Sequence, residues 1–388
     1  MSERTNGRRS AAGPASTAST ADGTSTMIEG VLVVGGGYAG VHAAQAASRA
    51  GASVAVLDPT GTYDFVPRLA AVAGGTAPAS DASIPLQELV DRVELGSAVR
   101  VADGVVETDD GVVYRADAVI VTAGAVSIIP DVPGIERALP LRTAADALAL
   151  REAIADASSV VVVGGGATGA QLAGAVAARH DASVTMVEAG PSLLAGMGDL
   201  GGHAATVLRD AGVEVLLETS VERLDDTGVV VDSGEQIDGL VVWAAGYDAR
   251  ADSLGIDVHD DGRILLDDHL RVAGFERTFA AGDIALHLDA DGRPLPMSAQ
   301  VAVQAGTQAG QNAARSLAGE PLRSSSLAQR GWVLDLGGWR GVAEIGPISI
   351  SMAPIDRIAP LLHAAIDVKH LFEIGGLRAI AAHWPGAA

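Results

Sequence analysis

The chain has 388 residues, 48% of them hydrophobic, and a formal net charge of −22. This length exceeds what one ordinary domain needs, so we expect two closely packed domains or one domain with additions. The acidic balance argues against nucleic-acid binding, and the absence of cysteine excludes disulfide scaffolds, thiolate metal sites and catalytic thiols.

The first 26 residues differ from the rest of the chain. They are rich in Ser, Thr, Ala and Gly and have no apolar periodicity, so we expect a disordered tail over residues 1–26. Arg8 and Arg9 do not indicate a twin-arginine signal, because Pro14 and a polar run follow where an apolar segment would stand. Met27 serves as a start as well as Met1, since the first apolar strand follows almost at once.

From residue 31 onward, predicted strands and helices alternate. The segment 31–34 is an apolar run typical of a buried parallel strand, and it is followed by a small-residue helix over 38–50 and a second buried strand over 53–57. No apolar segment reaches about 20 residues, so we expect no membrane-spanning helix.

The same order of elements returns later in the chain. A strand over 159–164, a helix near 167–179 and a strand over 183–188 repeat the first unit. The segments 105–124 and 224–246 each predict hairpin strands followed by a buried strand that ends in Ala-Gly. Each half of the chain therefore repeats a unit that is longer than one strand, one helix and the next strand.

The first unit carries a glycine loop. Gly35, Gly37 and Gly40 form G-x-G-x-x-G between a strand and a helix. The first glycine permits a tight turn, the second lets a pyrophosphate approach the backbone, and the third lets the helix pack on the strand. The helix N-terminus then offers unpaired N–H groups and a favourable dipole to the phosphates. Asp58 ends the next strand, where an acid binds the ribose hydroxyls of a dinucleotide.

The second unit repeats this arrangement. Gly164, Gly166 and Gly169 occupy the same positions of the pattern, and Glu188 ends the following strand. A carboxylate there accepts hydrogen bonds from a 2′-hydroxyl and repels a 2′-phosphate, so we expect NADH to be preferred over NADPH. An ordinary strand-to-helix turn explains either loop alone, but not both loops with both acids in place.

Two dinucleotide sites in one chain indicate a resident flavin that exchanges electrons with a visiting nicotinamide dinucleotide. The apolar segment 277–285 contains Gly282-Asp283 at the end of a strand, which suits an acid at the ribityl and phosphate region of FAD. We therefore expect tightly but non-covalently bound FAD at the first loop and NADH at the second. The fold class is α/β with two Rossmann-like dinucleotide-binding domains.

At these residues the sequence resembles the type II NADH:quinone oxidoreductases, a single-chain FAD enzyme family of the two-dinucleotide flavoprotein superfamily. The resemblance covers most of the chain after residue 30 and includes the segments 62–75, 141–152, 160–174, 187–197, 244–248 and 280–285. Together with the loops, it implies the following cofactor-binding residues: Gly35, Gly37, Tyr38, Ala39, Gly40, Asp58, Pro67, Ala123, Gly124, Gly164, Gly166, Thr168, Gly169, Glu188, Ala245, Gly246, Gly282, Asp283 and Ala299.

The segment 299–304 fits A-Q-x-A-x-Q, the quinone-site signature of that family, so the resemblance places Gln300 and Gln304 near a quinone head group. Without the family context, the two glutamines are also explained as polar positions on a small-residue helix over about 299–317, for which Ser298 is a good N-cap. The absence of cysteine excludes the disulfide and sulfide chemistry of other superfamily members. Electrons must therefore pass directly from the flavin to an external acceptor.

Some residues depart from the family pattern. Gln171 stands where the family has Glu, and Ala175 replaces another acid. The family carboxylate helps to place the nicotinamide, so its replacement by an uncharged amide predicts either slower NADH turnover or a different physiological donor. We keep Gln171 with Gln300 and Gln304 as candidate catalytic residues. Arg68 follows Pro67 in the loop expected over the flavin, where it either binds an acidic acceptor or faces water.

The C-terminal segment has an amphipathic pattern. One face carries an apolar stripe at helical spacing: Ile358, Leu362, Ala365, Ile366 and Phe372. The opposite face is polar and carries Asp356, His363, Asp367 and His370. Residues 369–380 resemble the membrane-contact segment of the family. The pattern predicts peripheral docking on a bilayer, or packing on the body or across a homodimer interface. The histidines show no metal-ligand spacing, so we expect no metal site.

These observations predict a discontinuous FAD-binding domain over 27–135 and 250–322, an inserted NADH-binding domain over 136–249, and a C-terminal contact segment over 323–388. The expected activity passes electrons from NADH through FAD to a quinone, in the cytoplasm or at the cytoplasmic face of the membrane. Two alternatives stay open. One is a soluble NADH-dependent ferredoxin or rubredoxin reductase, and the other is a flavin- or NADH-sensing interaction protein without enzymatic activity.

Overall fold

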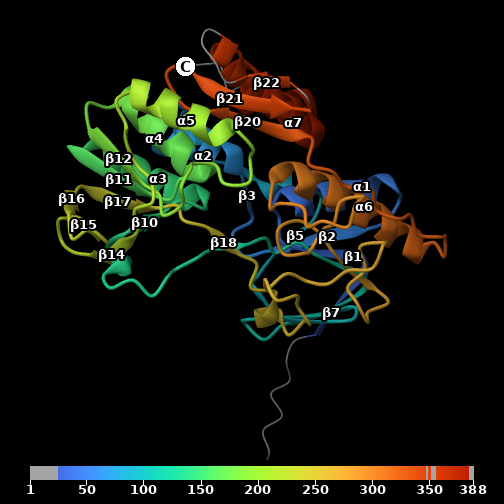
Figure 1. The fold of residues 1–388 in the computed structure, drawn as a ribbon. Coiled ribbons are helices and arrows are strands. Elements are labelled where there is room, and N and C mark those ends of the chain that lie inside the picture. The colour runs from blue at the N-terminus through green and yellow to red at the C-terminus, as the bar shows by residue number, and fades with distance from the viewer. Residues whose placement is uncertain (1–24, 347, 351–354, 384–388) are drawn as a thin grey trace, which may run out of the picture.

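The computed structural model describes residues 25–346, 348–350 and 355–383 (Figure 1). Its first half is built on a seven-stranded sheet in the order β5-β2-β1-β8-β7-β6, with β19 also paired to β8. The strands are β1 (Ser25–Val34), β2 (Val54–Asp58), β5 (Val93–Leu95), β6 (Ala98–Ala102), β7 (Val105–Thr108), β8 (Val113–Val121) and β19 (Thr278–Ala280). Strands β5, β2, β1, β8 and β19 run parallel, and the hairpin strands β6 and β7 continue the sheet in antiparallel fashion.

Strand β1 begins earlier than the sequence predicts. Ser25 and Thr26 already pair with β8, whereas the sequence assigns them to a disordered tail. Glu29 and Gly30 interrupt the apolar pattern before Val31, and the pairing register shifts there, between Ile28 and Val31, where Gly30 has a φ of +101°. The remainder of the predicted tail, residues 1–24, lies outside the described residues.

Two helices cover one face of this sheet, α1 (Tyr38–Arg49) and α6 (Ala299–Leu317), and Figure 1 shows them side by side. Their backbones are in close contact, because a Cβ atom at Gly306 would lie 2.1 Å from the carbonyl oxygen of Ala39. The small residues of both helices share one core cluster with Val31 and Val33 of β1. Residues of the 249–285 segment pack on the opposite face.

The second half repeats this plan on a five-stranded parallel sheet in the order β10-β17-β11-β12-β13. Its strands are β10 (Leu139–Pro140), β11 (Ser159–Val163), β12 (Ser183–Val187), β13 (Glu214–Leu216) and β17 (Leu240–Trp243). The helices α3 (Ala144–Ala155), α4 (Ala167–Arg179) and α5 (Leu200–Asp210) pack around one face, and an antiparallel sheet of β14 (Val221–Leu224), β15 (Gly228–Val231) and β16 (Gln236–Asp238) covers the other. Figure 1 shows this half in green and yellow. The predicted internal repeat and fold class are thereby confirmed.

Short elements connect the two halves. Strands β9 (Val126–Ser127) and β18 (Tyr247–Asp248) form an antiparallel pair where the chain passes from one half to the other and back. The first half also contains β3 (Thr62–Asp64), β4 (Ser83–Pro85) and α2 (Val66–Ala73). Helix α2 packs with α3 and α4 in the core of the second half. Short 3₁₀ helices lie at Ala79–Asp81, Leu86–Glu88, Ile135–Arg137, Ala251–Leu254 and Ile355–Arg357.

The C-terminal unit, shown in red in Figure 1, consists of a three-stranded antiparallel sheet and a long helix. The strands are β20 (Gly331–Asp335), β21 (Gly341–Ile345) and β22 (Ile348–Ile350), and the helix is α7 (Ile358–His383), which is kinked at Gly376. Leu334 and Val342 belong to the core of the second half, whereas Leu371 and Ile374 belong to that of the first. The unit therefore bridges both halves. Among the described residues, none of the helices combines the length and apolar character that crossing a bilayer requires.

Candidate functional site

The first glycine loop has the geometry that its pattern predicts. A Cβ atom at Gly35 would lie 2.4 Å from the Thr122 carbonyl oxygen, and one at Gly40 would lie 1.9 Å from that of Gly35. At Gly37, the N-cap of α1, a Cβ atom would meet nothing within 4 Å. The space beside this glycine is therefore open. Asp58 accepts a hydrogen bond from the Gly36 N–H at 2.8 Å. The loop thus has the open face and unpaired helix N-terminus that a pyrophosphate requires.

The glycines of the second loop make the same kinds of contact as those of the first loop. Gly164 has a φ of +109°, the space at Gly166 is open, and a Cβ atom at Gly169 would lie 2.0 Å from the Gly164 carbonyl oxygen. Glu188 accepts from the N–H groups of Gly165 and Gly190, both at 2.6 Å. The sequence patterns of both loops therefore correspond to the same local structure.

A pocket of about 440 Å³ opens over the second loop. Its lining includes all three glycines at positions 164–166 together with Glu188, Thr219 and Trp243. Ala245 and Gly246, two of the predicted cofactor-binding residues, line it as well. The carboxylate expected to bind a ribose therefore lies at the wall of a cavity that an external molecule can enter.

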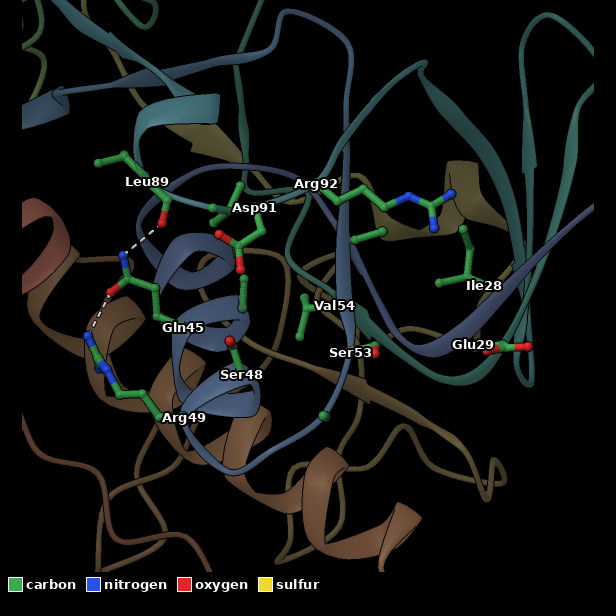
Figure 2. A pocket seen from close by; sticks show the side chains of 14 residues that line it. Ile28, Glu29, Gln45, Ser48, Arg49, Ser53, Val54, Leu89, Asp91 and Arg92 are labelled. Carbon is green, nitrogen blue, oxygen red and sulfur yellow. Dashed lines mark hydrogen bonds between the residues drawn. The ribbon is translucent and has the colours of Figure 1, made fainter.

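A different pocket, of about 610 Å³, lies near the N-terminal ends of β1 and β2, and Figure 2 shows its lining. It lies beside the C-terminal part of α1. The glycine loops, in contrast, follow the C-terminal ends of their strands. Its polar groups already bond one another, since Gln45 donates to the Leu89 carbonyl at 3.1 Å and accepts from Arg49 at 3.0 Å. Acidic and basic side chains alternate around it, so its charge favours no one kind of ligand.

The turn after β19 meets the first loop. A Cβ atom at Gly282 would lie 2.8 Å from that of Ala39, and 3.9 Å from that of Ala302 in α6. The Gly282 N–H donates to Nε2 of His287 at 3.1 Å, and burial lowers the pKa of this histidine to about 4. Neutral His287 therefore fixes the turn by accepting this hydrogen bond. No sequence motif indicates this role of His287, because the folding of the turn brings its ring to the backbone of Gly282.

Asp283 lies in this turn and forms an ion pair across the interface between the halves. Its Oδ2 accepts from Arg142 at 3.2 Å, and the two side chains are 18% and 20% exposed. The guanidinium of Arg142 also lies 4.5 Å from the ring centroid of Tyr247, and the Tyr247 hydroxyl bonds that of Thr168 at 2.8 Å. Neither Arg142 nor Tyr247 was singled out by sequence reasoning, although both lie within segments that carry the family resemblance.

Other predicted residues follow β8 or lie at the starts of α2 and α6. Ala123 and Gly124 follow β8, and Gly124 has a φ of +73° with open space around it. Pro67 lies in the first turn of α2. Ala299 begins α6, and the Ser298 hydroxyl accepts from the Val301 N–H, which confirms the predicted N-cap.

Both glutamines of the A-Q-x-A-x-Q segment hold the backbone that precedes β20. Gln300 Oε1 accepts from the Arg330 N–H at 2.5 Å, and Gln304 donates to the Ala328 carbonyl at 2.9 Å. Gln171 is half-buried on α4, and its amide has no hydrogen-bond partner among the residues described. The first two side chains thus have structural contacts, whereas the role of Gln171 stays a prediction.

Arg68 corrects the sequence prediction, because it neither faces water nor is free to bind an acidic acceptor. Its side chain is 12% exposed and contacts the buried carboxylates of Asp81 at 2.7 Å and Asp367 at 3.7 Å. The second partner, Asp367, comes from α7 and lies far away in the sequence. The sequence alone contains no signal for this contact.

Helix α7 buries its polar face and exposes much of its apolar face. Asp367 and His370 are buried, and the His370 Nε2 forms a 2.5 Å hydrogen bond with the Tyr63 hydroxyl. Tyr38 stacks on the His370 ring with 4.5 Å between centroids. The large apolar side chains left exposed on this helix are Ile358, Leu361, Ile366, Phe372 and Leu377. The predicted helix is confirmed, and its buried side combines Asp367 and His370 with apolar residues such as Leu371 and Ile374.

The two sheets and two matching glycine loops define an α/β protein with two dinucleotide-binding folds. A family model described as pyridine nucleotide-disulphide oxidoreductase matches residues 29–306. The chain therefore belongs to the pyridine nucleotide-disulphide oxidoreductase family. With no cysteine in its 388 residues, it has no disulphide of its own with which to act.

Among curated proteins, the chain is similar to a type II NADH:quinone oxidoreductase of Staphylococcus aureus strain MSSA476, with 31% identity over 240 residues. The match covers 56% of this chain and spans 58% of the length of that relative. The resemblance found in the sequence is thus supported by direct comparison.

Solved structures show the same fold. NDH2 from Plasmodium falciparum in complex with NADH has a TM-score of 0.76 at 14% identity, covering 92% of this chain and 97% of that one. The water-forming NADH oxidase from Lactobacillus brevis bound to NADH has a TM-score of 0.70 at 26% identity, covering 81% of this chain and 74% of that one.

Proposed function

We propose that this protein is an FAD-dependent oxidoreductase that passes two electrons from NADH to a quinone. The observation that carries the proposal is the pair of glycine loops, each with an open second glycine and a carboxylate at the end of the next strand. The overall reaction consumes NADH, a quinone and a proton, and yields NAD⁺ and a quinol. FAD bound at the first loop supplies the two-electron chemistry that no side chain of this chain offers.

The first loop is the proposed FAD site. Its pyrophosphate would lie over Gly37, and Asp58 would accept from the ribose hydroxyls. Asp283, beside the first loop through Gly282, is placed to accept from the ribityl chain. The N-terminus of α6 begins at Ala299 in the same region, and its partial positive charge would stabilise negative charge on the reduced cofactor.

The second loop is the proposed NADH site, because its pocket is open to an exchanging ligand. Glu188 lies in the pocket wall and is followed by Ala189 and Gly190, so no cation in this stretch would neutralise a 2′-phosphate. This arrangement supports a preference for NADH over NADPH. Gln171, on the helix that starts at this loop, would contact the nicotinamide by a hydrogen bond without charge.

A quinone is the proposed acceptor. The absence of cysteine removes the disulfide route of the family, and the curated relative is named for quinone reduction. Gln300 and Gln304 lie in the first two turns of α6 and hold the 328–330 backbone against it, so they would shape the quinone site at this end of the helix. The proposed domains remain 27–135 with 250–322 for FAD, 136–249 for NADH and 323–388 for contacts.

Peripheral membrane docking on the cytoplasmic face is proposed for the C-terminal unit. The exposed apolar side chains of α7 support this placement, and so do Trp339 and Ile348, which are 70% and 61% exposed in the same unit. A homodimer that covers these side chains is the alternative.

An anaerobic absorbance titration tests the function. The purified protein should carry a visible flavin spectrum that NADH bleaches and a short-chain quinone restores, with NADPH far less effective. Bleaching without recovery would favour the ferredoxin or rubredoxin reductase instead. A flavin spectrum that NADH never bleaches would contradict the enzymatic proposal and leave the sensing role.

A further inference from the structure

A row of four side chains connects the two glycine loops. It starts at Thr168 in the first turn of α4, whose hydroxyl bonds that of Tyr247 at 2.8 Å. The ring of Tyr247 lies 4.5 Å from the guanidinium carbon of Arg142, which donates to Asp283 at 3.2 Å. These contacts run without a break from the second loop to the turn that touches the first.

We propose that Arg142 and Tyr247 are positioning residues that couple the two loops, so that a nicotinamide dinucleotide bound at the second loop tightens the retention of FAD at the first. This inference rests on the proposed function and adds a thermodynamic link between its two sites.

Arg142 is fixed from several sides. Its Nε donates to the Ala125 carbonyl at 3.2 Å, and its backbone N–H donates to the carboxylate of Asp146 at 2.9 Å. With Nε bonded to Ala125, the guanidinium is held so that Nη2 donates to Asp283. A planar, fixed guanidinium orients a carboxylate better than a flexible ammonium group does.

Asp283 keeps an acceptor free for a ligand. Arg142 bonds Oδ2, while Oδ1 has no hydrogen-bond partner within the described part of the chain. The carboxylate is therefore held in a set orientation by one oxygen and offers the other. Because both side chains of the ion pair are largely covered, solvent screens this contact less than a surface pair.

The coupling follows from ordering shared side chains. Each of the four side chains loses rotamer freedom when its neighbour is fixed, so a dinucleotide that holds Thr168 also restricts Tyr247, Arg142 and Asp283. A second ligand then binds side chains that are already ordered and loses less conformational entropy. Linkage requires that FAD strengthen nicotinamide dinucleotide binding by the same factor.

The test measures FAD affinity rather than turnover. Holoenzyme is diluted, and free FAD is followed by its recovered fluorescence, with and without saturating NAD⁺, which cannot reduce the flavin. We expect NAD⁺ to lower the Kd of FAD by about fivefold or more, at the lower end of typical coupling between sites.

Variants assign the effect to the row of side chains. Tyr247→Phe keeps the ring below Arg142 but removes the hydroxyl, and it should reduce the NAD⁺ effect to less than about twofold. Thr168→Val removes the same hydrogen bond from the other side and should act alike. Arg137→Gln is the matched control, because this nearby arginine contacts the exposed Asp226 and lies off the row.

The outcomes separate the two proposals. An FAD Kd that NAD⁺ leaves unchanged in the wild-type protein would overturn the coupling while the proposed function stands. So would a full NAD⁺ effect in folded Tyr247→Phe and Thr168→Val. A protein that binds neither FAD nor NAD⁺ would overturn the function and the coupling together.

Discussion

Asp58 and Glu188 occupy equivalent positions in the two halves, and each side chain orients its glycine loop before any ligand binds. Asp58 accepts from Gly36 through one oxygen and from the N–H groups of Thr60 and Gly61 through the other. Glu188 accepts from Gly165 and Gly190 in the same way. A carboxylate bonded to several backbone N–H groups is fixed in place, which suits it to receive ribose hydroxyls.

Arg68 allows a direct stability test. We expect Arg68→Ala to lower the free energy of unfolding by about 3–5 kcal/mol, because it leaves the buried Asp81 carboxylate without its cation and leaves Asp367 with only its 3.5 Å contact to His363. Urea denaturation measures the change. Arg92→Ala is the control: its pair with Glu94 is half exposed, and its loss should cost less than about 1 kcal/mol. Equal losses in the two variants would contradict the buried ion pair.

Among the secondary-structure elements, helices α1 and α6 pack closely against each other. Gly306 and Gly310 let the backbone of α6 approach Ala39 and Ala43 of α1, which follows the first loop directly. Any separation of the two helices would also move the Gly282 turn relative to that loop. The glycines of α6 therefore shape the proposed FAD site without facing it.

The same substitution should have opposite effects at two helical glycines. Gly306→Ala places a methyl group 2.1 Å from a backbone oxygen, so we expect a loss of about 1–3 kcal/mol in unfolding free energy and weaker FAD retention. Gly202→Ala on α5 meets open space and should gain about 0.5–1 kcal/mol. Thermal melts and flavin fluorescence report both effects. A harmless Gly306→Ala would show that the helices do not require this contact.

Helix α7 supports a second prediction at this scale. Replacing Leu361, Ile366 and Phe372 together by Ser removes exposed apolar area without altering the buried polar face. We expect the variant to lose co-sedimentation with neutral phosphatidylcholine vesicles, while a Leu288→Ser control, exposed on a loop, binds as wild type. Sedimentation equilibrium of both proteins tests the dimer alternative. A wild-type protein that never associates with vesicles would contradict membrane docking.

At the scale of the whole molecule, the C-terminal unit bridges the halves. Its sheet packs on α4, where a Cβ atom at Gly174 would lie 1.9 Å from the Leu336 carbonyl oxygen. His370 of its helix stacks with the ring of Tyr38 in α1 and with that of Tyr63. The unit therefore limits relative movement of the two dinucleotide sites.

Buried histidines make stability depend on pH. Burial lowers the pKa of His42 and His287 to about 4 and that of His370 to about 3. The unfolded chain takes up these protons near pH 6.5, so the stabilisation is complete above about pH 6.5 and is lost as the pH falls towards 4. Each histidine contributes a slope of about 1.4 kcal/mol per pH unit in this range. Because His287 accepts from Gly282, FAD retention should decline over the same range.

Urea denaturation near pH 7 and about pH 5.5 tests this dependence. His370→Gln should reduce the slope, because it removes one of the buried imidazoles with a lowered pKa. His363 acts in the opposite sense: burial lowers its pKa, but the hydrogen bond and charge of Asp367 outweigh this and raise it overall. Its contribution is present at acid pH and is lost as the pH rises through the raised pKa. Stability that does not change between the two pH values would contradict the assignment of the buried neutral imidazoles.

The residue patterns alone predict the repeated strand–loop–helix units, the acid after each second strand and the N-cap of α6. These features are local: glycine conformations, caps and apolar runs depend on neighbours within a few residues. The partners of Arg68, the buried face of α7, and the contact of Arg142 with Asp283 and Tyr247 become visible in the folded chain alone. Such groups lie far apart in the chain, as Tyr63 and His370 do at 307 residues, and a charge or ring becomes buried only where folding brings its partner.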